Sequence, residues 1–189
     1  MRKRTLPLLL PALAATLLPA AIFRGRRKYS GHARELLDYR SSVSERTQRI
    51  DTVLAELGEM VDALRRHATD LDMAVDRLTE GEEELDKEAE ELRELAAPEP
   101  LHLLHMEYEA NLERALRGIV TAERGCGLTK QRHRKADDEE PLTYWKRGHA
   151  NIVNARLRMG EITEVLIAWE PGRPAVADVS ARVHKAREG

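Results

Sequence analysis

A seven-residue repeat of apolar side chains constrains this chain more than any other feature. Within 30–97 every seventh residue is Leu, Ile or Val, over nine repeats: Leu36, Val43, Ile50, Leu57, Leu64, Leu71, Leu78, Leu85 and Leu92. A second row, four residues later in each repeat, is mostly apolar from Leu54 to Ala96. Such a pattern over more than three or four repeats predicts a coiled-coil helix. No proline interrupts 30–97, so we expect one long helix there, on the order of 100 Å in length.

The second half of the chain predicts two shorter helices. Pro98 and Pro100 end the long helix, and apolar residues recur at helical spacing over 101–124. Residues 125–140 hold Gly125, Gly127 and opposed charges, which predicts a charged loop. Pro141 is suited to a helix start, and residues 141–170 predict a third helix. We therefore expect an all-α fold in which the two later helices fold back as a hairpin to form a three-helix region, followed by a tail over 171–189.

The composition favours long helices over a compact enzyme core. Charged residues make up 34% of the chain and aromatic residues only 4%. Eight of the 31 basic residues precede Glu35, the first acid, so the other 23 stand against 33 acids after residue 34. The acidic body would be repelled by nucleic acid, and we expect no nucleic-acid binding. The acids concentrate over 79–94, which is a solvated helix face or, less conservatively, a docking surface for a basic partner.

The N-terminal residues 1–29 predict an anchor or a targeting segment. Residues 5–23 carry no charge over 19 positions, which is long enough to cross a bilayer as a helix, and basic clusters flank them on both sides. The main expectation is therefore a single-pass membrane anchor. A secretory signal peptide is a second interpretation, although the sequence lacks a good cleavage site. A mitochondrial presequence is a third, because Arg27-Lys28-Tyr29-Ser30 resembles a matrix processing pattern.

Candidate chemical groups are few and carry no recognisable catalytic motif. His102, His105 and Glu109 share one face of the predicted second helix at spacings that suit a metal, but no fourth ligand is indicated. Cys126 is the only cysteine, so no intramolecular disulfide can form. Pairing it with His133 or His149 would give a thiol and a base, but that spacing has no signature. We expect no catalytic, cofactor-binding or metal site.

The sequence therefore predicts a non-enzymatic, membrane-anchored coiled-coil scaffold or tether. The heptad rows would bury their apolar surface against a helical protein partner or a second copy, and part of the row near Leu36–Leu64 would remain open for that partner. Residues 5–23 would contact the membrane. No small-molecule substrate is implied. The alternative is a soluble helical subunit of a mitochondrial assembly after removal of residues 1–29. The third interpretation, an enzyme using Cys126 or the histidines, has the least support.

Overall fold

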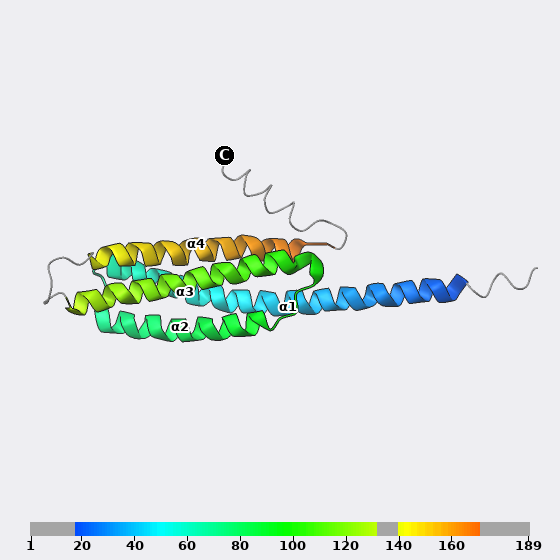
Figure 1. Ribbon diagram of the computed structural model, residues 1–189, viewed down its shortest axis with the longest axis horizontal. Helices are drawn as coiled ribbons and strands as arrows, with labels where there is room; N and C mark the ends of the chain where they lie inside the picture. Colours follow the sequence, from blue (N-terminus) through cyan, green and yellow to red (C-terminus); the bar gives the residue numbers. More distant parts are fainter. Residues whose placement is uncertain (1–17, 132–139, 171–189) are drawn as a thin grey trace, which may run out of the picture. The chain divides into compact units, whose positions relative to one another are not determined.

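The computed structural model describes residues 18–131 and 140–170, which form four α-helices, one short 3-10 helix and no strands (Figure 1). The helices are α1 (Leu18–Arg65), α2 (Leu71–Arg93), α3 (His102–Gln131) and α4 (Pro141–Ala168), and η1 (Glu99–Leu101) precedes α3. The chain divides into two compact units, Met1–Asp38 and Tyr39–Gly189. In the first unit the described residues are the N-terminal part of α1. In the second, the rest of α1 and the three later helices form a four-helix bundle.

Consecutive helices of the bundle run antiparallel, as ion pairs between them show. Between α1 and α2, Arg49 bonds Glu88 at 2.6 Å and Glu56 bonds Arg77 at 2.7 Å, so residue numbers rise on one helix as they fall on the other. Between α2 and α3 the equivalent contacts are the Thr79–Glu123 hydrogen bond and the Lys130–Asp72 ion pair. Arg158 of α4 bonds Glu107 of α3. The topology is therefore the up-down-up-down arrangement that short connections favour.

The expected single helix over 30–97 is wrong, because the chain turns back on itself between Arg65 and Leu71. His67 adopts a positive φ of 54°, and hydrogen bonds run from its N–H to the Leu64 carbonyl and from the Ala68 N–H to the Ala63 carbonyl. This pattern is a Schellman motif, which ends a helix and is usually made by glycine. Asp70 then caps α2, accepting from the N–H groups of Asp72 and Met73. The expected three-helix region is consequently a bundle of four helices.

The heptad row supplies the core of the bundle from both sides of this turn. Its residues in the second unit are buried on α1 and α2, except for the half-buried Leu71: Val43, Ile50, Leu57, Leu64, Leu78, Leu85 and Leu92. Helix α3 contributes Leu104, Tyr108, Leu112 and Ile119, and α4 contributes Trp145, Ile152, Met159 and Ile162. The row from Val43 onward is thus covered by the chain's own helices, and the expected open surface over its Val43–Leu64 part is absent.

Helix α3 extends into the segment expected to be a loop. It reaches Gln131, so Gly125, Cys126 and Gly127 are helical, and the expected loop over 125–140 is wrong for its first seven residues. Gly125 is buried because α4 packs against it: a Cβ there would lie 2.8 Å from the Trp145 ring. Residues 132–139, most of residues 1–29 and the tail 171–189 lie outside the described residues. Helix α4 covers nearly the whole of the expected range 141–170. No helix within the described ranges is both long enough and apolar enough to span a bilayer.

Candidate functional site

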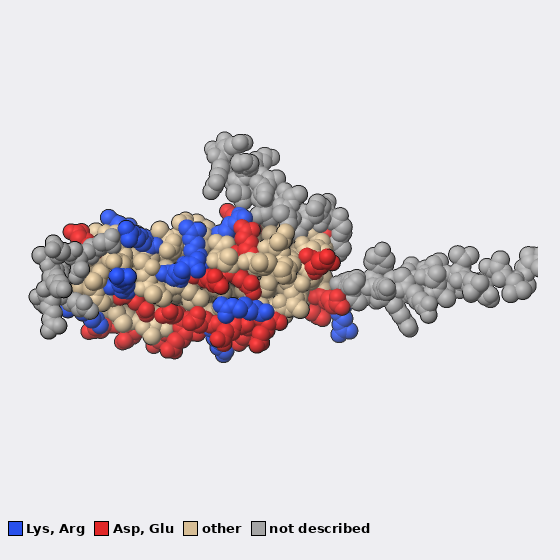
Figure 2. Space-filling model, in the orientation of Figure 1, with Lys and Arg blue, Asp and Glu red and all other residues tan. Residues whose placement is uncertain are grey.

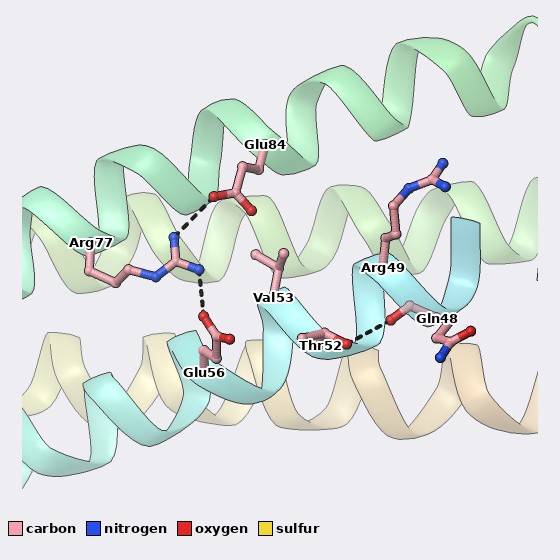
Figure 3. A pocket seen from close by; sticks show the side chains of 7 residues that line it. All are labelled: Gln48, Arg49, Thr52, Val53, Glu56, Arg77 and Glu84. Carbon is pink, nitrogen blue, oxygen red and sulfur yellow. Dashed lines mark hydrogen bonds and ion pairs between the residues drawn. The ribbon is translucent and has the colours of Figure 1, made fainter. Parts of the chain in front are cut away.

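The groove between α1 and α2 is lined by charged side chains that bridge the two helices (Figure 3). Arg77 of α2 donates to Glu56 of α1 at 2.7 Å and to Glu84 of its own helix at 3.3 Å. The groove has a volume of about 400 Å³, and its lining residues are Gln48, Arg49, Thr52, Val53, Glu56, Arg77 and Glu84. Because the opposed charges are already paired across it, the groove offers no unneutralised charge to a small ionic ligand.

A second ion-pair cluster continues this seam towards the C-terminal end of α2. Glu88, whose side chain is 16% exposed, accepts from Arg49 at 2.6 Å and from Arg46 at 3.3 Å. Arg46 also donates to Glu91. The hydrogen bond from Arg46 lowers the pKa of the Glu91 carboxyl, so it stays ionised at neutral pH. These networks hold α2 against α1 through its acids nearest to α1.

The remaining acids of α2 leave the outer surface of the bundle electrically asymmetric. Helix α2 carries ten acidic and three basic residues. Acidic side chains gather along α2 in Figure 2, whereas basic side chains gather over α3 and α4. Glu83 and Glu90 are exposed on this acidic face. A surface of this kind attracts cationic partners and repels acidic ones, through a field that salt screens.

The histidines singled out from the sequence do not form a metal site. His105 is buried; its Nδ1 lies 2.9 Å from the Tyr39 hydroxyl and its Nε2 lies 3.3 Å from Glu109. Both ring nitrogens therefore have partners, and His102 is exposed on the same helix. Burial lowers the pKa of His105, against the opposing charge of Glu109. Among the described residues no group of three His, Cys, Asp or Glu side chains is placed to hold a metal ion.

Cys126 and His149 are not brought together as a thiol and a base. Cys126 is buried in α3, and this burial raises the pKa of its thiol, which disfavours the reactive thiolate. The Nδ1 atom of His149 lies 3.3 Å from the guanidinium of Arg65. His133, the other proposed base, lies outside the described residues. The described part of the chain therefore shows no activated cysteine.

One polar feature of the core was missed from the sequence. Tyr108 is 2% exposed, and its hydroxyl has no hydrogen-bond partner. The side chains of Thr47 and Thr163, from α1 and α4, line a small cavity with it. The available signal was Thr47 itself, a polar residue at a heptad position where an apolar one is expected.

Comparisons with known proteins do not place the chain in a family. No family model matches it, and neither a curated protein nor a solved structure does.

Proposed function

We propose that the protein is a non-enzymatic scaffold or tether, held at a membrane by residues 5–23, whose helical bundle binds a protein partner. The observation that carries this proposal is the union of two features in one chain. An uncharged, basic-flanked segment long enough to span a bilayer is followed by a bundle that buries its own heptad rows. Helix α1 begins at Leu18, within that uncharged segment, and continues without a break to Arg65.

The proposed partner surface is the exposed face of α2. The coiled-coil row was the first candidate, but from Val43 onward it is occupied by the chain's own helices, and a partner would have to open the bundle to reach it. The α2 face needs no such opening, and its ten acids against three bases favour a partner with a basic surface. The partner is therefore expected to be a protein with a cationic helix or patch.

The membrane half of the proposal is tested by the mature N-terminus. The full chain would be recovered from its native host, and its intact mass and N-terminal sequence determined before and after alkaline extraction of membranes. Retention of residues 1–29 with resistance to extraction supports the tether. A chain that starts at Ser30 and is released in soluble form supports the alternative, a helical subunit of a mitochondrial assembly.

The partner half is tested by charge reversal on α2. Glu83→Lys and Glu90→Lys reverse exposed acids on the proposed face, and Glu164→Lys makes the same change at an exposed position of α4. A partner recovered with the wild type in low salt should bind the Glu83 and Glu90 variants several-fold more weakly and the Glu164 variant normally. Equal binding by all three variants would exclude the α2 face.

A further inference from the structure

A small cavity between α1 and α4 is closed at its inner end by Tyr108 of α3. The other residues that shape it are Thr47 and Ile50 from α1 and Met159, Gly160 and Thr163 from α4. Its volume is about 120 Å³. Cavities of roughly 150 Å³ in protein cores admit molecules as large as benzene. The interior of a helix bundle is also a common position for ligand sites.

The hydroxyl groups around the cavity leave one donor unused. Thr47 donates to the Val43 carbonyl at 2.8 Å, and Thr163 donates to the Met159 carbonyl at 2.8 Å, each within its own helix. The Tyr108 hydroxyl, in contrast, has no hydrogen-bond partner although its residue is 2% exposed. Buried hydroxyls are nearly always paired, so an unpaired one beside a cavity points to a missing acceptor. Burial raises the pKa of Tyr108 to about 12, so this group keeps its proton at neutral pH.

The charges at the rim exclude an ionic ligand. Asp51 and Arg156, which also line the cavity, form a two-pronged ion pair with distances of 2.6 and 3.0 Å. Because each charge already has its partner, an ionic ligand would be left without a counter-charge. Gly160 gives the cavity additional room, since a Cβ at this position would meet no atom within 4 Å.

We propose that this cavity binds a small neutral organic molecule with one hydrogen-bond acceptor, such as a short-chain ketone or alcohol. The Tyr108 hydroxyl donates to the acceptor, and the side chains of Ile50 and Met159 contact the apolar part of the molecule. This site is independent of the proposed tether function, because it lies inside the bundle and requires neither a membrane nor a protein partner.

The probe for this proposal is 2-butanone, which has a single carbonyl acceptor and a size suited to the cavity. The full chain, labelled at Ile and Met methyl groups, would be titrated with 2-butanone and followed by NMR. We expect saturable shifts at Ile50 and Met159, with a dissociation constant in the millimolar range, as befits so small a ligand. Tyr108→Phe removes the donor and keeps the ring, and should weaken binding roughly tenfold.

A filling variant provides the matched control. Gly160→Leu places a side chain in the open space beside the cavity and should abolish the saturable shifts, while leaving the helical circular dichroism of the chain unchanged. Absence of saturable shifts in the wild type would overturn the proposal, as would ordered water as the only occupant of the cavity in crystals grown with 2-butanone. Equal affinity of the wild type and Tyr108→Phe would also overturn it, because the hydroxyl would then play no part.

Discussion

The closest approach of two helices in the bundle predicts that a single methyl group destabilises it. Gly148 of α4 faces Gly118 of α3 so closely that a Cβ on Gly148 would lie 2.7 Å from the Gly118 carbonyl oxygen and 3.0 Å from the Cβ of Ala122. The first neighbour is backbone and cannot rotate away, so Gly148→Ala must separate α3 from α4 locally. Overpacking of this kind costs about 1–3 kcal/mol. Replacing glycine by alanine within a helix returns roughly 1 kcal/mol.

The expected net effect of Gly148→Ala is a loss of about 1–2 kcal/mol in the free energy of unfolding. The matched control is Gly160→Ala on the same helix, where a Cβ would meet no atom within 4 Å. That variant should gain roughly 0.5–1 kcal/mol from helix propensity alone. Gly81→Ala should fall between the two, because its Cβ would lie 2.7 Å from the Cδ atoms of Leu57, whose side chain can move.

Urea unfolding followed by circular dichroism at a helical band measures these differences. The midpoint should shift down for Gly148→Ala and up for Gly160→Ala, with an unchanged slope, since the surface exposed on unfolding is the same. For a chain of this size, each kcal/mol corresponds to roughly 2–4 °C in Tm. If Gly148→Ala were as stable as Gly160→Ala, α3 and α4 would not approach at the distance described, and the argument would be refuted.

Four smaller perturbations test other parts of the bundle. Because burial lowers the pKa of His105, the unfolded chain takes up protons first, so stability should fall as pH drops below about 6.5, the ordinary pKa of histidine, and this slope should flatten in His105→Gln. Cys126 is 0% exposed, so its modification by a soluble disulfide reagent should be at least a hundredfold slower than in urea, on the order expected for opening-limited access. His67→Gly relieves the positive φ of 54° and should raise the free energy of unfolding by about 0.5–1 kcal/mol, whereas His67→Ala should not. Glu88→Gln should cost under about 1 kcal/mol, and a loss that did not shrink in high salt would contradict the ion-pair assignment.

The helical character of the chain and its core rows follow from the sequence because a period of seven leaves few options. A row of Leu, Ile and Val at this spacing must face a common core, and the residues of that row from Val43 to Leu92 are buried apart from the half-buried Leu71. The extent of α4 follows similarly, because Pro141 marks its start. Local chemistry and one-dimensional spacing are sufficient for these features.

The turn at His67 and the Tyr108 cavity depend on information that the spacing lacks. A Schellman motif made by histidine has no glycine to mark it, and Arg66–Asp70 includes no proline. The continuation of α3 through Gly125 depends on Trp145 of α4, which packs where a side chain would otherwise stand. The hydroxyls of Tyr108 and Thr47 lie on different helices, so their shared cavity exists only once the bundle has formed.

The heptad row explains why the folded-back arrangement is compatible with a sequence that also predicts a straight rod. The seven-residue spacing continues across the turn, from Leu64 through Leu71 to Leu78, so both arrangements present the same residues to a core. A rod must find its partner at the concentration of free protein. In the hairpin, α3 and α4 cover the row within the same chain, where tethering gives an effective concentration on the order of millimolar. Any partner that binds the row must displace α3 and α4 against that advantage, whereas one that binds the outer face of α2 displaces nothing. The proposed contact is therefore placed on α2.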